Sequence, residues 1–316
     1  MSCHECSSER GFARIAWALG LVALLVACGG SPPAATEEVL ETELVVEPLT
    51  PDATDEVLLE HLLAIERQGV VSAELVRHFP DLDRERAYRL QRMRLERKEA
   101  TDARVGWKIG WSRQTDPRVS IDPVFGHILM SNVYQPGQPV PTDGFVNGQA
   151  LVEAEVAVWL NQDLPGPAVT RDDVMGAIQE VGGVIELLNP RVGADGEATY
   201  THDHGIADNV FHIGVMFGDQ RAPAGEIDWA GERVSLEVNG EARAEGRMSY
   251  VMGRDPVQGV VWIANELLKY GYQLRAGDVV ITGTVVKPPP IGAGDAARLT
   301  YSTLGTVELL VAEGGE

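Results

Sequence analysis

The chain has 316 residues, of which 47 are Asp or Glu and 26 are Lys or Arg, so its formal net charge is -21. This excess of negative charge repels phosphate backbones and argues against nucleic-acid binding, which depends on clustered Lys and Arg. With 44% hydrophobic residues the chain can bury a core, in one large or two small domains, which excludes disorder of the whole chain. Its 3 cysteines are too few for a disulfide scaffold.

The beginning of the chain has the pattern of a secretory signal. Arg10 and Arg14 precede an apolar run at residues 15–27, which is shorter than the about 20 residues that a membrane-spanning helix needs. The run ends in Leu-Val-Ala-Cys-Gly-Gly, which resembles the lipobox of bacterial lipoproteins and implies that Cys28 is acylated. We therefore expect a signal peptide at 1–27 and a lipid-anchored protein of the bacterial cell envelope, on its periplasmic or extracellular face. An ordinary signal peptide or an uncleaved anchor is the alternative.

Residues 28–52 follow as an acidic segment that contains proline. Between Arg14 and Arg67 the chain has ten acidic residues and neither Lys nor Arg. Because proline breaks helices and like charges extend a chain, we interpret this segment as a tether. A C-x-x-C pair lies before it, in the part expected to be removed, so the mature chain would keep Cys28 alone.

Residues 53–103 are predicted to form an N-terminal helical segment. Apolar residues recur at spacings of one, three or four between Val57 and Ile65, as on one face of a helix. A second helix is expected after the Pro-Asp-Leu-Asp sequence at 80–83, with basic residues on its outer face. These are Arg84, Arg86, Arg89, Arg92, Arg94, Arg97 and Lys98. We interpret this face as solvated, because two glutamates interrupt it; a patch for an anionic lipid or nucleic acid is the alternative.

Residues 104–316 are predicted to form a single α+β domain. Short strand-like segments alternate with Gly and Pro turns, and two helices interrupt them. The first helix is expected at 171–181, after Thr170, whose hydroxyl can cap it. The second is expected to begin at Asp255 as the N-cap and to stop at Gly271. Strands that outnumber helices without regular alternation argue against a doubly wound or TIM-barrel fold.

Three glutamates are candidate metal ligands. Glu153 and Glu155 alternate with apolar residues in a strand-like segment, so their side chains share one face, with Cα atoms about 6.6 Å apart. Since like charges repel, a cation or a basic partner is expected beside them. Glu186 lies in an apolar stretch, where a buried charge needs a partner. The three together suit Mg²⁺ or Mn²⁺, and the alternative for the first two is a solvent-exposed pair.

Six short segments occur in a specific order and spacing. They are GWKIGW at 106–111, PVFGHI at 123–128, VEAEVAVWL at 152–160, VIELLNPR at 184–191, IADNVFHIG at 206–214 and AGDVVITGT at 276–284. In this order they resemble the 2-keto-4-pentenoate hydratase and 2-oxo-acid decarboxylase branch of the fumarylacetoacetate hydrolase superfamily, over residues 52–312. The resemblance implies a mixed β-sandwich-like fold with N-terminal and flanking helices, a homo-oligomer, and bound Mg²⁺ or Mn²⁺.

The same resemblance implies roles for individual residues. It assigns the metal to Glu153, Glu155 and Glu186, and an acid/base or substrate-binding role to Lys108. It places Asp208, Asn209 and Thr284 near the substrate. Hydratases of this branch usually carry an acid at the position of Val124, so Asp122, two residues earlier, is the candidate that would replace it as a catalytic group.

The resemblance and the residue types together predict a metal-dependent lyase. Its substrate would be a small anionic 2-oxo or 2-hydroxydienoic acid, with Lys108 moving a proton after a metal ion or burial has lowered its pKa. A hydratase is expected first. A 2-oxo-acid decarboxylase and a non-catalytic, lipid-anchored relative that binds oxo acids are the alternatives. His202 and His204 form an H-x-H for which metal binding is the less favoured alternative, and His127 is expected to be structural.

Overall fold

The computed structural model of the protein describes residues 48–116, 118–194 and 199–314. The expected signal peptide, Cys28 and most of the expected tether lie outside the described residues, so these remain predictions. Within the described ranges, no helix combines the length and the apolar character that crossing a membrane would require.

Three helices open the described chain. They are α1 (Asp55–Gln68), α2 (Glu74–His78) and α3 (Arg84–Glu99). α1 begins after Thr54, whose hydroxyl accepts a hydrogen bond from the amide of Val57, and ends at Gly69 in the left-handed conformation that glycine favours. The apolar face predicted for this helix is confirmed for Leu58 and Leu62, which are buried, whereas Val57 is 46% exposed.

One of the basic residues of α3 is not solvated. The side chain of Arg94 is 1% exposed, and its guanidinium lies 2.6 Å from a carboxylate oxygen of Glu66 and 3.0 Å from one of Asp208. Arg92 and Arg97 do face solvent, with side chains 47% and 54% exposed. The interpretation of the whole face as solvated is therefore wrong at Arg94, because two carboxylates pair with it inside the protein.

The strands of the described residues form two sheets. The larger, eight-stranded sheet has the order β2-β1-β9-β4-β5-β6-β3, and β10 also pairs with β4. Its strands are β1 (Arg104–Gly110), β2 (Val124–Leu129), β3 (Val133–Tyr134), β4 (Gln149–Leu160), β5 (Ile178–Leu188), β6 (His212–Ala222), β9 (Val279–Ile281) and β10 (Pro290–Gly292). The four-stranded sheet has the order β12-β11-β7-β8. Its strands are β7 (Arg233–Val238), β8 (Glu241–Arg247), β11 (Ala296–Tyr301) and β12 (Thr306–Leu310).

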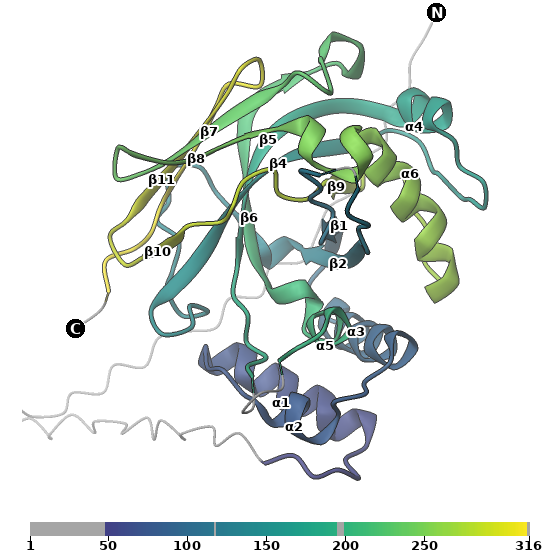
Figure 1. Cartoon of the computed structure of the whole chain (residues 1–316), viewed down its shortest axis with the longest axis vertical. Coiled ribbons are helices and arrows are strands. Elements are labelled where there is room, and N and C mark those ends of the chain that lie inside the picture. Colours follow the sequence, from purple (N-terminus) through teal and green to yellow (C-terminus); the bar gives the residue numbers. More distant parts are fainter. Residues whose placement is uncertain (1–47, 117, 195–198, 315–316) are drawn as a thin grey trace, which may run out of the picture. The chain divides into compact units, whose positions relative to one another are not determined.

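Pairing in the larger sheet is mixed. The long strands β4, β5 and β6 pair antiparallel, whereas β1 and β9 pair parallel. In Figure 1 the smaller sheet lies to the left of these strands, α6 (Val257–Glu266) and α4 (Arg171–Ala177) lie at the upper right, and α1 to α3 lie below them with α5 (His202–Ala207). The predicted α+β class, with a mixed sandwich-like arrangement and flanking helices, is confirmed.

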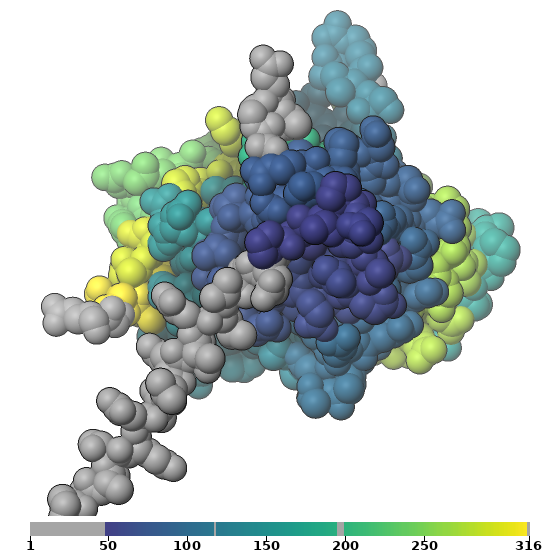
Figure 2. Space-filling view, turned by 90° about the horizontal axis from the view of Figure 1, so that it is seen from below, coloured from purple at the N-terminus to yellow at the C-terminus, as the bar shows by residue number. Residues whose placement is uncertain are grey.

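The N-terminal helices belong to the same compact unit as the strands. Figure 2 shows their purple and blue residues covering the middle of one face of the molecule. The segment at 53–103 is therefore packed on the strand-rich part and is no separate domain.

The two predicted helices after residue 104 are present with shifted ends. α4 begins after Thr170, whose hydroxyl caps it as predicted, but it ends at Ala177 rather than at 181. From Ile178 the backbone is extended, because these residues pair with β4 and β6 as β5. Pairing in the sheet therefore outweighs the local helical pattern.

α6 begins one position later than predicted. Pro256 is its N-cap, and the side chain of Asp255 accepts a hydrogen bond of 3.1 Å from the amide of Val257. The helix continues into a 3₁₀ turn (Leu267–Tyr270), which ends at Gly271 with a φ of 84°, as the predicted stop requires. The short α5 was not predicted.

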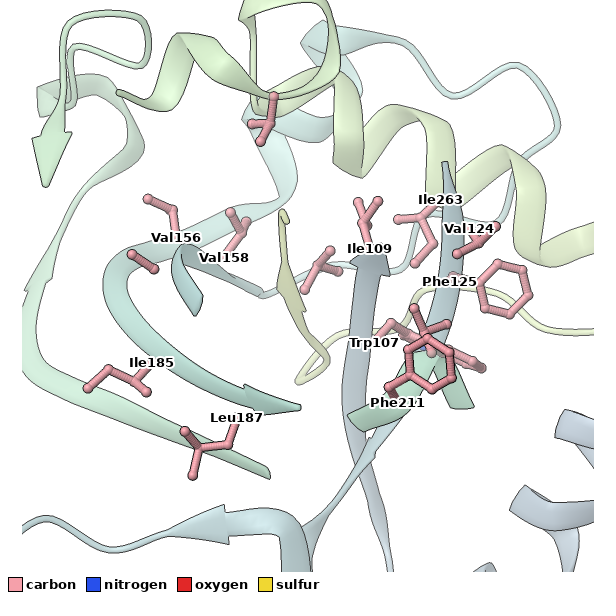
Figure 3. Packing of buried hydrophobic residues seen from close by; sticks show 14 of the residues in the cluster. Trp107, Ile109, Val124, Phe125, Val156, Val158, Ile185, Leu187, Phe211 and Ile263 are labelled. Atoms are coloured by element: carbon pink, nitrogen blue, oxygen red, sulfur yellow. The ribbon is translucent and has the colours of Figure 1, made fainter. Parts of the chain in front are cut away.

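The main core fills the space between the larger sheet, α3, α6 and the smaller sheet. Figure 3 shows part of it, with Trp107 and Ile109 of β1, Val124 of β2 and Ile263 of α6. Each of these four side chains is at most 1% exposed. Burial at this scale holds β1, β4 and β5 in place, and the candidate site residues project from these strands.

Candidate metal and active site

The three predicted glutamates lie together on one face of the larger sheet. Glu153 of β4 is directly opposite Glu186 of β5, and Glu155 follows two residues along β4 on the same face. One oxygen from each of the three carboxylates lies within 4.8 Å of the others. Glu155 and Glu186 are 0% exposed, which excludes the alternative of an exposed pair at Glu155. The prediction that these carboxylates converge is confirmed.

Glu155 is held by the loop that follows β9. The amide of Gly283 donates a hydrogen bond of 2.7 Å to Oε2 of Glu155. Gly283 has a φ of +97°, and a Cβ at this position would come within 1.8 Å of Oγ of Ser112, so only glycine fits here. From the other side, the hydroxyl of Tyr301 donates to the backbone carbonyl of Glu155 at 2.5 Å. Both contacts fix the side chain and the backbone of this glutamate.

Glu186 is held by two basic side chains. Nζ of Lys108 lies 2.6 Å from Oε1 of Glu186, and Nδ1 of His212 lies 2.7 Å from the same oxygen. Lys108 also donates to the carbonyl of Val210 at 3.1 Å. Lys108 and His212 are 1% and 2% exposed. The sequence predicted Lys108 but not His212, although this histidine stands in the IADNVFHIG segment.

An apolar cluster surrounds the polar groups on this face. Val184 is opposite Glu155, Val215 is opposite Glu186, and Ile281 is opposite Lys108. These three side chains belong to a cluster with Ile128, Ala157 and Val279, and all six are at most 3% exposed. The carboxylates and Lys108 are thus in a surrounding of low polarity, where charges interact strongly.

The pKa values of the carboxylates diverge for this reason. Burial, reinforced by repulsion from Glu186, raises the pKa of Glu153 to about 8 and that of Glu155 well above its ordinary value. Burial also acts on Glu186, but Lys108 and His212 outweigh it and lower its pKa to about 2. The prediction that burial lowers the Lys108 pKa is wrong: burial opposes the charged form, but the surrounding carboxylates outweigh it and raise the pKa.

The residues of this site fit a divalent cation. Oε1 of Glu155 and Oε2 of Glu186 are buried, and neither has a hydrogen-bond partner within the described ranges. Buried oxygens of this kind need a partner, and three carboxylates facing one ammonium leave an excess of negative charge. Hard oxygen ligands suit Mg²⁺, Mn²⁺ or Ca²⁺. Glu153, Glu155 and Glu186 are therefore the residues that would hold it.

Asp208 and Asn209 are buried beside this site and bind protein groups. The carboxylate of Asp208 accepts hydrogen bonds from Arg94 and Arg191 at 3.0 Å each. The side-chain amide of Asn209 pairs with the backbone of His127, accepting from its amide at 2.9 Å and donating to its carbonyl at 3.0 Å. These contacts with protein groups occupy both side chains. They do not test the predicted role of Asp208 and Asn209 in substrate binding, which stays a prediction.

Thr284 and Asp122 have different surroundings. Thr284 follows Gly283, the donor to Glu155, and its hydroxyl lies 3.4 Å from the carbonyl of Val286. Asp122 is half-exposed and accepts two hydrogen bonds from Arg84, at 2.7 and 2.5 Å, which lower the pKa of its carboxyl. No described contact joins Asp122 to Lys108, so its catalytic role also stays a prediction.

Val124 occupies the place where an acid is expected in hydratases. It pairs with Gly110 across β1 and β2, on the same face as Lys108, and is fully buried. A Cβ at Gly110 would lie 2.5 Å from the Val210 side chain and 3.3 Å from that of Val124, so both valines close on Gly110. This position therefore offers an apolar contact and no proton.

The histidines of the H-x-H have protein partners. The ring of His204 contacts Thr201 through Nδ1 and the carbonyl of Phe79 through Nε2, both at 2.9 Å. His202 stacks on Trp111, with ring centroids 4.2 Å apart. These contacts favour a structural role and give no support to the metal alternative.

Comparisons with known proteins cover the strands and the site. Residues 107–312 match the family model described as fumarylacetoacetate (FAA) hydrolase C-terminal. The chain is 30% identical over 250 residues to 2-hydroxyhexa-2,4-dienoate hydratase from Comamonas testosteroni, in an alignment covering 78% of this chain and 93% of that protein. It is 28% identical over 262 residues to 2-oxo-hept-4-ene-1,7-dioate hydratase from Escherichia coli, covering 80% and 96%.

Solved structures show the same fold. 4-Oxalocrotonate decarboxylase from Pseudomonas putida G7, complexed with calcium and acetate, is similar to this chain with a TM-score of 0.74 and 26% identity, covering 82% of this chain and 98% of that one. Its complex with magnesium and adipate gives a TM-score of 0.73 at 25% identity and the same coverage. Because the family model matches more than half of the chain, this chain belongs to the fumarylacetoacetate hydrolase family, and the three carboxylates and Lys108 lie inside the matched range.

Proposed function

We propose that the protein is a divalent-metal-dependent lyase that acts on a small anionic 2-oxo or 2-hydroxydienoic acid, as a hydratase. The observation that carries this function is the set of three converging carboxylates, two of them fully buried, with the ammonium of Lys108 2.6 Å from one of them. The names of the similar hydratases support the substrate class, since they act on dienoic and oxo-enoic acids.

We propose Mg²⁺ or Mn²⁺ as the metal. The magnesium named in the similar decarboxylase structure and the all-carboxylate ligand set support this choice. When bound, the ion would supply a Lewis acid that polarises the carboxylate and 2-oxo oxygens of the substrate.

Lys108 is the residue we assign to proton transfer. An ammonium has three N–H donors, and Glu186 and Val210 accept from two of them. One donor is left to meet the substrate. Glu186 contacts Nζ and is itself held by His212, and the buried apolar cluster beside the site limits the access of water to Nζ.

A decarboxylase is the second candidate. The burial of Val124 favours it, because the position lacks the acid that hydratases of this branch usually carry. The similarity to 4-oxalocrotonate decarboxylase points in the same direction. The two reactions differ in their products, since a hydratase adds water and a decarboxylase releases CO₂.

The test is turnover by the purified full-length chain in detergent, loaded with Mg²⁺ or Mn²⁺. Loss of a 2-hydroxydienoate by absorbance, with the product's mass increased by one water, is expected; CO₂ release from an oxo-diacid would assign the decarboxylase. Glu153→Gln should abolish turnover, whereas Glu180→Gln on β5, with a partly exposed side chain, serves as the matched control. Turnover of neither substrate class would contradict the proposal.

We also propose that Cys28 carries a lipid anchor in the bacterial cell envelope and that the enzyme is a homo-oligomer. The lipobox-like sequence before Cys28 supports the anchor, and the family resemblance supports the assembly. Light scattering of the detergent-solubilised protein measures the assembly directly.

A further inference from the structure

The turn between α5 and β6 has an unfavourable backbone. Asn209, Val210 and Phe211 have φ angles of 51°, 53° and 63°. Left-handed backbone is favourable for glycine and tolerated by asparagine, but it is disfavoured for most other residues and most of all for a β-branched one such as Val210. Three such residues in succession persist only where the surrounding structure holds them. The contacts on both sides of the turn show what holds it.

Arg191 brackets the turn at its two ends. Its Nε donates to the carboxylate of Asp208 at 3.0 Å, and its Nη2 donates to the backbone carbonyls of Asp208 and His212, both at 3.3 Å. Arg94 donates to the same carboxylate at 3.0 Å. Both arginines are 1% exposed and Asp208 is fully buried. Charged hydrogen bonds in such surroundings are strong and directional.

Asn209 fastens the turn to β2. Its side-chain amide pairs with both the amide and the carbonyl of His127, like a neighbouring strand. This approach requires glycine at position 126, because a Cβ there would lie 2.8 Å from Oδ1 of Asn209. The turn is therefore fixed against the strand that pairs with the one carrying Lys108.

The turn delivers two groups to the candidate active site. The carbonyl of Val210 accepts from Nζ of Lys108 at 3.1 Å, and His212 follows directly and contacts Glu186 at 2.7 Å. Nζ of Lys108 therefore donates both to the carboxylate of Glu186 and to the backbone carbonyl of Val210. A shift of the turn would move both the ammonium and the imidazole.

We propose that Asp208, Arg191 and Arg94 are positioning residues for Lys108. This inference rests on the proposed function and deepens it. The three buried side chains clamp the strained turn, and the turn aims Nζ of Lys108 at the substrate. Their effect on the reaction passes through the Val210 carbonyl, and none of the three contacts the substrate.

The clamp also gives the N-terminal helices a part in the site. Arg94 comes from α3. Its Nη1 contacts Asp208, and its Nη2 lies 2.6 Å from a carboxylate oxygen of Glu66 in α1. Glu66 is in turn paired with Lys98 at 2.7 Å. A chain of ion pairs therefore leads from α1 through α3 to Asp208.

The test measures kcat and KM of the metal-loaded full-length enzyme with Asp208→Asn, in the presence and absence of Val210→Gly. Glycine adopts the left-handed backbone without strain, so the clamp matters less when it replaces Val210. Asp208→Asn should lower kcat about ten- to hundredfold with KM changed less than about threefold. In the Val210→Gly background the loss from Asp208→Asn should be at least about threefold smaller.

Further variants and measurements separate positioning from folding. Arg191→Lys keeps the charge and loses the forked contact to both ends of the turn, so it should lower kcat. This variant keeps the test available if Asp208→Asn fails to fold. Glu232→Gln removes the charge of another buried carboxylate, which binds Thr303 in the turn between β11 and β12, and should leave kcat within about twofold of the wild type. Calorimetry of Mg²⁺ binding should give a dissociation constant within about threefold of the wild type for Asp208→Asn and Arg191→Lys.

Three outcomes would overturn the inference. One is an unchanged kcat in both clamp variants. Another is that Asp208→Asn raises KM equally with and without Val210→Gly and leaves kcat unchanged, which would instead indicate that Asp208 binds the substrate. The third is unchanged hydrogen exchange in residues 205–214, a readout that needs no substrate and is expected to rise in the clamp variants. A wild type without turnover would contradict the proposed function, while the exchange measurement would still decide the clamp.

Discussion

Metal binding should be coupled to proton release from Glu153. Burial and the charge of Glu186 raise the pKa of Glu153 to about 8 in the metal-free protein. At pH 6 the carboxyl is therefore protonated in about 99% of molecules, and at pH 8 in about half. A metal ligand must be deprotonated, so the apparent affinity should rise about fiftyfold, or about 2.3 kcal/mol, between pH 6 and pH 8. The raised pKa of Glu155 adds to this effect in the same direction.

The stability of the metal-free protein should change in the opposite direction. The folded pKa of Glu153 lies above the unfolded one, so between about pH 4.5 and pH 8 the unfolded chain has released a proton that the folded protein keeps. The free energy of unfolding therefore falls as the pH rises through this range. Bound metal should reverse this trend, since its affinity rises over the same interval.

Isothermal titration calorimetry with Mg²⁺ at pH 6, 7 and 8, in two buffers of different ionisation enthalpy, measures both the affinity and the protons released. Glu153→Gln should weaken binding and remove one proton from the count, and Glu180→Gln should change neither. A dissociation constant that is the same at pH 6 and pH 8, with no proton release, would refute the reasoning, because it would mean that the carboxylates are already ionised without metal.

Three further predictions follow from the same contacts. Lys108→Met should lower kcat by about 10² to 10⁴ while Mg²⁺ still binds, because it removes the proton donor and leaves the carboxylates; kinetics and calorimetry on one preparation check this, and a kcat near the wild type would exclude the assigned role. Arg94→Met should lower the free energy of unfolding by about 3 to 5 kcal/mol in urea denaturation, because Glu66 and Asp208 lose a buried partner. Arg97→Met, at an exposed position, should change it by less than about 0.5 kcal/mol. Equal effects of the two variants would contradict the pairing. Cys28→Ser should move the protein out of the membrane fraction of expressing bacteria, and continued membrane attachment of this variant would argue against the anchor.

Local patterns in the sequence predicted the parts of the site that depend on strand geometry. Alternation puts Glu153 and Glu155 on one face whatever the rest of the fold does. The meeting with Glu186 needed the register of β4 against β5, which the sequence does not specify, and the family resemblance supplied it. The stop at Gly271, after the 3₁₀ turn that continues α6, was predicted for a similar reason, since a left-handed residue ends a helix locally.

The parts that were missed depend on tertiary contacts. Arg94 stands in a run of basic residues that looks solvated, and only the packing of α3 on the Asp208 turn buries it. His212 gave no signal beyond its place in a matched segment, because its role comes from the contact with Glu186 between the neighbouring strands β5 and β6. The left-handed backbone at 209–211 contradicts the preferences of Val210 and Phe211, so no propensity could have predicted it.

The charge of the site explains why an acidic protein can accept an anionic substrate. Three carboxylates and the ammonium of Lys108 leave two negative charges when all are ionised, and a divalent ion would bring this sum to zero. Without the ion, burial raises the pKa values of Glu153 and Glu155, and their protonation also removes the two excess negative charges. Glu186 keeps its charge because it is paired with Lys108 and His212. The site would therefore be neutral in two arrangements: with Glu153 and Glu155 protonated, or with all three glutamates ionised around a divalent ion. In the second arrangement the ion would face the anionic substrate with a positive charge that protonation cannot supply, so we expect substrate binding to depend on the metal.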